Sequence, residues 1–167
     1  MSKFQSNPNK IYILDDEDQV IFTSKHKEEP LIEGDSGANF IDAFIAYSPA
    51  GIAEGDLVYV HFGRVEDLRK LKNMGIDING KICMARYGKI FRGNKLKHCQ
   101  DAGAIGMILF SDPADVAIQG TKPENVYPNT IFLPGTTLHY YNIIIHKDNK
   151  AHIKRFGDRK IYYFSSL

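Results

Sequence analysis

Residues 55–113 read GDLVYVHFGRVEDLRKLKNMGIDINGKICMARYGKIFRGNKLKHCQDAGAIGMILFSDP and have the clearest secondary-structure pattern of the chain. Apolar runs alternate in it with segments whose apolar side chains recur every three or four residues. The predicted strands cover residues 57–62, 81–87 and 104–110, and the predicted helices cover residues 65–74 and 91–102. The order strand–helix–strand–helix–strand predicts an α/β unit. Because the third strand is almost entirely apolar, we expect it to be covered on both faces.

Each predicted helix has one apolar face, which we expect to be buried. The first helix is expected to end at Gly75 and the second at Gly103, since glycine commonly terminates helices. The expected buried side chains are Val65, Leu68, Leu71 and Met74 in the first helix, and Leu96, Cys99 and Ala102 in the second.

The N-terminal part of the chain predicts a β-hairpin. Apolar runs at residues 10–14 and 19–23 flank the acidic run at residues 15–18, and β-forming residues on both sides of a polar turn are typical of hairpins. The acidic run lacks the glycine and the glutamate that an EF-hand loop requires. A solvated turn is therefore favoured over a calcium site. The apolar run at residues 40–47 leads into a turn sequence at residues 48–51.

The composition limits the classes of function. The 167 residues suit one domain with a modest core. The formal net charge of +1 gives no overall field that favours nucleic acid or a membrane surface. No apolar run approaches the roughly 18 residues of a spanning helix, and residues 1–10 lack the apolar core of a signal peptide. The sequence therefore predicts no nucleic-acid partner, and we find no targeting signal in it.

The cysteines and histidines do not predict a metal site. Cys83 and Cys99 are too few for a disulfide framework, and their apolar neighbours indicate buried thiols. His139, His146 and His152 have spacings that match no common zinc motif. We therefore expect no metal ligand and no catalytic residue in this chain.

A basic cluster surrounds the start of the second predicted helix. Arg86 and Lys89 precede the helix, while Arg92 and Lys95 are expected to share one face of its first turn. The free amides and the positive dipole end of a helix start favour an anion, and the planar fork of arginine matches a carboxylate. Two interpretations stay open, a carboxylate-binding site and a solvated basic face. A phosphate loop is disfavoured, because Asn94 stands where that motif requires lysine.

These residues also carry a family resemblance. The motifs that carry it are SPAG (48–51), EGDLVYV (54–60), GKI (80–82), ARYGK (85–89), FRGNK (91–95), AGA (102–104), SDPAD (111–115) and LPG (133–135). This combination resembles the protease-associated (PA) domain of the glutamate carboxypeptidase II family, which includes the N-acetylated alpha-linked acidic dipeptidases and the transferrin receptor. The resemblance extends over about residues 10–135 and is densest over residues 48–113.

The resemblance implies a fold and a role. It implies a β-sandwich or open barrel flanked by two or more helices, which refines the α/β prediction. It also implies a lid over the substrate cavity of a zinc carboxypeptidase, with no catalytic centre in this chain. Arg92 matches the family's arginine that contacts the carboxylate of the substrate's C-terminal glutamate. Asn94 and Lys95, in the same motif, are expected to be further substrate-binding residues.

The resemblance implies partners as well. The expected partners are the peptidase domain of the parent chain and the C-terminal glutamate of a peptide substrate. Two zinc ions are expected in that peptidase domain and none in this chain. Members of the family are type II membrane glycoproteins with an extracellular ectodomain and form homodimers, although this part alone is not expected to dimerise.

The sequence departs from the family pattern after residue 135. Residues 136–167 lack the family's glycine-rich continuation, and strands at residues 140–145 and 160–164 are conceivable there without clear partners. We therefore divide the chain into residues 1–47, with strands and a loop, residues 48–135, an incomplete domain core, and residues 136–167, a divergent tail. We interpret the chain as a fragment without hydrolytic activity. The alternatives are a stand-alone interaction module, as in sorting receptors and the transferrin receptor, and a truncated product that does not fold stably.

Overall fold

The computed structural model of the chain describes residues 10–25, 27, 30, 32–34, 51–133, 142–145 and 160–165. The apolar run at residues 40–47 and the histidines His139, His146 and His152 lie outside the described residues. No helix within the described segments is long and apolar enough to cross a membrane.

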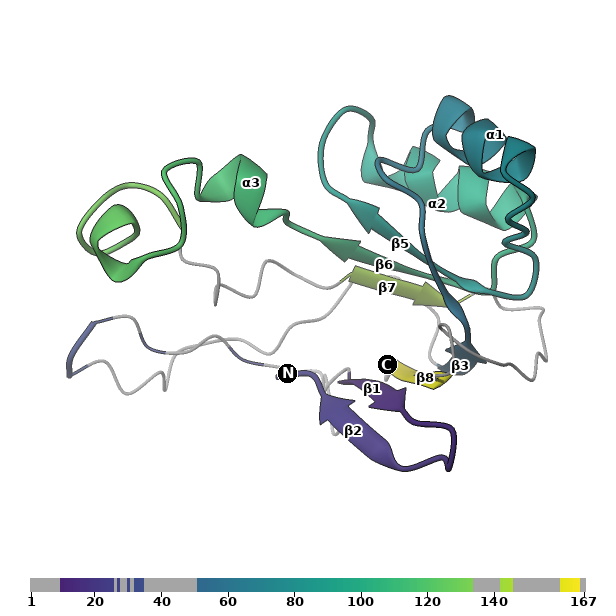
Figure 1. Cartoon of the computed structure of the whole chain (residues 1–167), viewed down its shortest axis with the longest axis horizontal. Coiled ribbons are helices and arrows are strands. Elements are labelled where there is room, and N and C mark those ends of the chain that lie inside the picture. Colours follow the sequence, from purple (N-terminus) through teal and green to yellow (C-terminus); the bar gives the residue numbers. More distant parts are fainter. Residues whose placement is uncertain are drawn as a thin grey trace, which may run out of the picture.

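A four-stranded central sheet carries the α/β unit predicted from residues 55–113. Its strands are β4 (Leu57–Tyr59), β5 (Ile82–Arg86), β6 (Gly106–Phe110) and β7 (Asn142–Ile145), in the order β4-β5-β6-β7. The first three are parallel and β7 is antiparallel to β6. The two crossover helices, α1 (Val65–Asn73) and α2 (Arg92–Asp101), lie together on one face of this sheet (Figure 1). Crossovers of one hand place consecutive helices on the same side of a sheet in this way.

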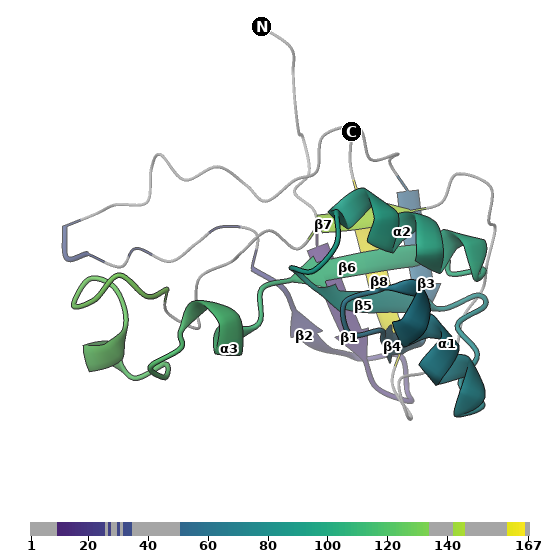
Figure 2. The ribbon, with the colours of Figure 1, turned by 90° about the horizontal axis from the view of Figure 1, so that it is seen from above.

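A second, antiparallel sheet lies on the opposite face of the central sheet (Figure 1). Its strands are β1 (Lys10–Leu14), β2 (Val20–Thr23), β3 (Gly51–Gly55) and β8 (Lys160–Ser165), in the order β2-β1-β8-β3. Asp56 alone separates β3 from β4, so the chain passes from one sheet directly into the other. Figure 2 shows strands of this second sheet crossing beneath the central one.

The N-terminal hairpin forms as predicted, with β1 and β2 antiparallel. Its acidic turn is closed by its own first carboxylate, because Asp15 Oδ1 accepts from the amides of Glu17 at 3.0 Å and Gln19 at 2.8 Å. Such side-chain-closed turns are a common use of aspartate. The acidic run therefore has a structural role that needs no ion.

Side chains of β5 alternate between two apolar cores. Ile82 packs in the core between the two sheets, whereas Cys83 and Ala85 pack in the core beneath the helices. β6 alternates likewise, with Ile108 toward the second sheet and Met107 toward the helices. A strand buried on both faces reads as a continuous apolar run, so the expectation that both faces are covered is confirmed. Two packed sheets flanked by two helices also confirm the expected fold class.

The two strands that the sequence suggested near the C-terminus are both formed, and each has partners that sequence reasoning did not find. β8 pairs with both β1 and β3, and β7 pairs with β6. The partners of β8 are more than a hundred residues away along the chain, so no local turn indicates the pairing. The division of the chain at residue 135 stays a prediction, although the structure places a strand from beyond it in each sheet.

The predicted helix faces need correction. Leu68 and Leu71 pack against the core, but Val65 and Met74 are 50% and 64% exposed. In α2, Cys99 is buried as predicted, Ala102 is exposed, and Lys95 is buried in place of a further apolar residue. After β6, the chain continues in the short helices α3 (Pro113–Val116) and η1 (Pro123–Asn125).

Candidate functional site

The loops that follow β4, β5 and β6 meet at the carboxyl edge of the central sheet. A small cavity of about 290 Å³ opens between them. Its lining comes from each of the three loops, namely Phe62, then residues 87–89, then Ser111, Asp112, Asp115 and Val116. Open sheets with parallel strands bind ligands at this edge. The basic segment that begins α2 rises from the same loops, which makes this edge the candidate site.

Lys95 joins two of these loops. Its side chain is 0% exposed, and its Nζ donates to the main-chain carbonyls of Phe62 at 2.6 Å and Gly88 at 2.7 Å. A buried polar group is tolerated when such partners satisfy it. Desolvation by burial lowers the pKa of Lys95. One side chain of α2 therefore ties the loop after β4 to the loop after β5.

The loop after β4 is shaped to receive this lysine. Gly63 adopts a φ of 65°, and a Cβ atom there would lie 3.1 Å from the Cβ of Lys95. Only glycine can adopt this positive φ without strain and also leave room for the side chain of Lys95. The carbonyl of Gly63 lies 2.9 Å from Nδ1 of His98, and the Nδ1–H tautomer of that ring donates to it. Lys95 and His98, three residues apart in α2, thus hold consecutive carbonyls of one loop.

The ring of Phe62 lies among four cations. It is 8% exposed, and its centroid is 4.8 Å from Cζ of Arg86 and 5.4 Å from Nζ of Lys95. Arg64 and Lys89 approach it at 5.6 Å and 5.8 Å. The negative face of an aromatic ring attracts such cations. Phe62 therefore helps to keep several positive charges together at this edge.

Arg86 is held by two carboxylates from the loop and helix after β6. Its Nη2 lies 2.6 Å from Oδ2 of Asp115, and its Nη1 lies 3.3 Å from Oδ2 of Asp112. The hydrogen bond to Asp115 raises the pKa of Arg86. Asp112 also accepts from the amide of Ala114 at 2.9 Å and so begins α3. Arg86 is thereby occupied in joining β5 to α3.

Arg92 and Asn94 face solvent in the first turn of α2. The guanidinium of Arg92 has no hydrogen-bond or ion-pair partner among the described residues. The main-chain amide of Asn94 donates to the carbonyl of Phe91 at 3.0 Å, while its side-chain amide faces outward. Lys89, which lines the cavity, is also exposed, whereas Arg92 and Asn94 are not part of the lining. The outward groups at this edge are thus a planar guanidinium fork, an ammonium and a carboxamide.

The exposed cations at this edge are groups of the kind that bind anions. No group of three or more histidine, cysteine, aspartate or glutamate side chains gathers in the part of the chain that the structure describes. The two thiols, Cys83 and Cys99, are both buried and free. Their mutual hydrogen bond and their burial raise the pKa of Cys83, which keeps that thiol protonated and unreactive.

The sequence grouped Arg86, Lys89, Arg92 and Lys95 as one open basic cluster, and the structure separates them. Arg86 and Lys95 have internal partners, whereas Arg92 and Lys89 are exposed. Arg92 and Lys95, which were expected on one helix face, differ in burial: Lys95 is buried because its side chain reaches two carbonyls, whereas Arg92 is exposed. The binding of substrate by Arg92, Asn94 and Lys95 stays a prediction.

Sequence reasoning did not identify Phe62 or the pair Asp112 and Asp115 as parts of this edge. The carboxylates belong to the SDPAD motif, which is one of the motifs that carry the family resemblance. A basic residue at the end of one strand and two acidic residues after the next parallel strand are brought together by the fold. Once the strands had been predicted, their parallel order could have indicated that Arg86 lies close to Asp112 and Asp115.

Comparison with known proteins gives consistent matches over this region. Residues 52–143 match the family described as PA domain. The chain is 43% identical over 129 residues to "Glutamate carboxypeptidase 2 homolog" of Caenorhabditis elegans, which covers 77% of this chain and 17% of that protein. It is 30% identical over 127 residues to "Aminopeptidase NAALADL1" of Mus musculus, covering 76% of this chain and 17% of that protein.

A further relative has a different kind of name. The chain is 39% identical over 83 residues to "Transferrin receptor protein 2" of Homo sapiens, which covers 50% of this chain and 10% of that protein. In each case the chain spans less than a fifth of the relative's length. The similarity therefore concerns one region of longer proteins.

Proposed function

This chain belongs to the PA domain family, and on that premise we propose that it is the substrate-binding lid of a glutamate carboxypeptidase-like zinc peptidase. Its PA region is similar to that of glutamate carboxypeptidase 2 homologues. In the proposed role, the guanidinium of Arg92 holds the C-terminal carboxylate of a peptide that ends in glutamate. Asn94 supplies a neighbouring hydrogen-bonding group.

The exposed and unpartnered guanidinium of Arg92, at the start of a helix, is the observation that carries this proposal. A guanidinium binds a carboxylate through two parallel hydrogen bonds, and the helix dipole adds attraction for the same anion. Among the described residues nothing pairs with it, and the carboxylates of the cavity, Asp112 and Asp115, are bound to Arg86.

Lys95 has a positioning role in this proposal. Its ammonium fixes the carbonyls of Phe62 and Gly88, and Gly88 precedes the turn from which Arg92 projects. A direct contact between Lys95 and a substrate would require the ammonium to leave both carbonyls. The lysine thus restricts the motion of the loop, so that less conformational entropy is lost when Arg92 binds its ligand.

The chemistry of hydrolysis belongs to a peptidase domain in this proposal. The described residues do not gather a zinc-ligand set, so the two zinc ions implied by the family would be held elsewhere, together with the water that they activate. The partners of this chain would be that peptidase domain and the peptide substrate. The membrane anchor and the homodimer of the family are part of the same proposal.

A titration of the chain with short peptides tests the carboxylate site. Amide resonances of residues 92–94 and the Arg92 Nε–H resonance are followed by NMR while Ala-Ala-Glu, its C-terminal amide or Ala-Ala-Lys is added. We expect the largest shifts with Ala-Ala-Glu. Arg92→Ala should lower the affinity for this peptide ~3-fold or more, because an exposed ion pair contributes a free energy of that order. In a closed, desolvated cavity the same substitution would cost about 2–4 kcal/mol.

Lys70→Ala is the control, because Lys70 is likewise an exposed cation of a crossover helix and lines neither this cavity nor the groove beside α1. This variant is expected to keep the shifts at residues 92–94. Equal shifts with the amidated peptide, or unchanged affinity in Arg92→Ala, would overturn the carboxylate site. The chain would then be better described as an interaction module without substrate contact.

A further inference from the structure

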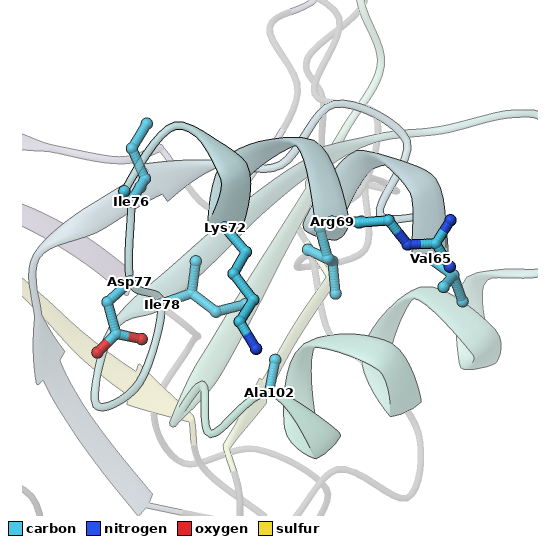
Figure 3. A pocket seen from close by; sticks show the side chains of 9 residues that line it. Val65, Arg69, Lys72, Ile76, Asp77, Ile78 and Ala102 are labelled. Atoms are coloured by element: carbon cyan, nitrogen blue, oxygen red, sulfur yellow. The ribbon is translucent and has the colours of Figure 1, made fainter.

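A groove runs between α1 and α2 on the outer face of the molecule, and the site described above uses none of its residues. Its volume is about 640 Å³. Leu68, Ile78 and Ala102 contribute its apolar floor. Figure 3 shows the groove from close by, with the side chains of α1 above and the end of α2 below.

Apolar side chains remain exposed along this groove. Val65, at the start of α1, is 50% exposed, and Ile76, beyond the end of α1, is 36% exposed. Met74, which adjoins Gly75 of the lining, is 64% exposed. Although α1 has an apolar side, none of its residues is buried. Exposed apolar side chains thus lie within the lining of the cavity itself.

The walls of the groove are basic. Arg69 and Lys72 both line it. Figure 3 shows Arg69 directed toward Val65, and Lys72 with its amine directed toward Ala102. Neither cation has an ion-pair partner among the residues that the structure describes. The one carboxylate of the lining, Asp77, accepts from the amide of Asn79 at 3.0 Å.

We propose that this groove is a docking surface for a short amphipathic peptide segment of a partner protein that carries carboxylates beside its apolar anchors. The apolar floor would receive the anchors, and Arg69 and Lys72 would pair with the carboxylates. This is the helix-in-groove mode of recognition, in which anchors recur every three or four residues. Burial strengthens such ion pairs and selects against a basic partner.

The dimensions favour a peptide over a small amphiphile. The nine residues of α1 give the groove a length of about 13 Å, which is two to three helical turns. A small acyl carboxylate would engage one cation and leave Val65 or Ile76 uncovered. A peptide of two to three turns covers both ends and places carboxylates opposite both cations.

Fluorescence anisotropy with two labelled peptides tests the proposal. One peptide, about three helical turns long, has leucines at helical spacing and glutamates elsewhere, and the other has lysines in place of the glutamates. We expect the glutamate peptide to bind the chain at least ~10-fold more tightly than the lysine peptide. The double variant Arg69→Glu/Lys72→Glu is expected to lower its affinity at least ~10-fold and to reverse the preference.

Lys70→Glu is the matched control, because Lys70 is exposed on the same helix but does not line the groove. It is expected to change the affinity less than ~3-fold, and NMR shifts on binding should fall on residues 65–78 and Ala102. No binding of the glutamate peptide, or equal losses in Lys72→Glu and Lys70→Glu, would overturn the proposal. Displacement of the peptide by decanoate at a lower concentration than the peptide's own Kd would also overturn it, in favour of a small amphiphile.

Discussion

Helices α1 and α2 lie side by side on one face of the central sheet (Figures 1 and 2), but they bury different kinds of side chain. α1 has the clearer apolar stripe in its sequence, yet none of its residues is buried. α2 is mostly polar, yet it buries Lys95 and Cys99 completely. Lys95 and His98 of α2 hold three main-chain carbonyls of neighbouring loops.

The difference shows that burial in this domain depends on the partners that a position offers. The loops beneath α2 present carbonyls that would be costly to leave without donors, and a lysine can satisfy two of them at once. No described element packs over the outer side of α1, so Val65 stays exposed there, although Leu68 and Leu71 pack against the core. The buried contacts of α2 therefore organise the loops of the candidate site, whereas the exposed side of α1 forms the proposed docking surface.

Removal of the buried lysine should have the largest effect. Lys95→Ala leaves the carbonyls of Phe62 and Gly88 without their donor and opens a cavity, so we expect the free energy of unfolding to fall by about 3 kcal/mol or more. Urea denaturation measures this change. Lys97→Ala is the control from the same helix, since Lys97 is exposed and, among the described residues, pairs with Asp101 alone. It should cost less than about 0.5 kcal/mol, and equal losses in both variants would refute the structural role of Lys95.

A second prediction concerns the pH dependence that Lys95 causes. Its folded-state pKa is lowered by burial from the ordinary value of 10.5. Between the two values the unfolded chain binds a proton that the folded chain does not, so stability rises with pH there, by at most about 1.4 kcal/mol per pH unit. We expect the difference in unfolding free energy between wild type and Lys95→Met to increase from pH 7 toward the ordinary pKa. A flat or falling difference would show that hydrogen bonding of the ammonium to the two carbonyls outweighs desolvation in setting the pKa of Lys95.

The smallest effect on stability is expected on the outer side of α1. Val65→Ser and Met74→Ser change side chains that are 50% and 64% exposed, so each should alter the free energy of unfolding by less than about 0.5 kcal/mol. Thermal unfolding followed by circular dichroism measures this. A loss above 1 kcal/mol would mean that these residues are covered in solution, and the contrast between the two helices would then disappear.

The sequence predicted the fold where its pattern was local. The run at residues 104–110 indicated a strand covered on both faces, and β6 has that environment. The hairpin around Asp15 and the helix ends at Gly75 and Gly103 were also predictable, because each depends on neighbouring residues. β8 was not placed, since its partners β1 and β3 are brought to it by the whole chain.

The candidate site was predictable in part for the same reason. The position of Arg92 at a helix start follows from local sequence, and the structure places it there. The burial of Lys95 depends on carbonyls at positions 62 and 88, which a periodicity argument does not see. Spacing alone therefore assigned Arg92 and Lys95 to one face, although only Arg92 is exposed.

We propose that two basic residues three positions apart serve separate purposes, Arg92 to bind a carboxylate and Lys95 to hold the loops. The most direct test is to measure, for Arg92→Ala, both the free energy of unfolding and the affinity for Ala-Ala-Glu beside wild type. We expect a free energy of unfolding within about 0.5 kcal/mol of wild type, together with loss of the NMR shifts at residues 92–94. Unchanged peptide affinity, or a destabilisation as large as that of Lys95→Ala, would contradict it.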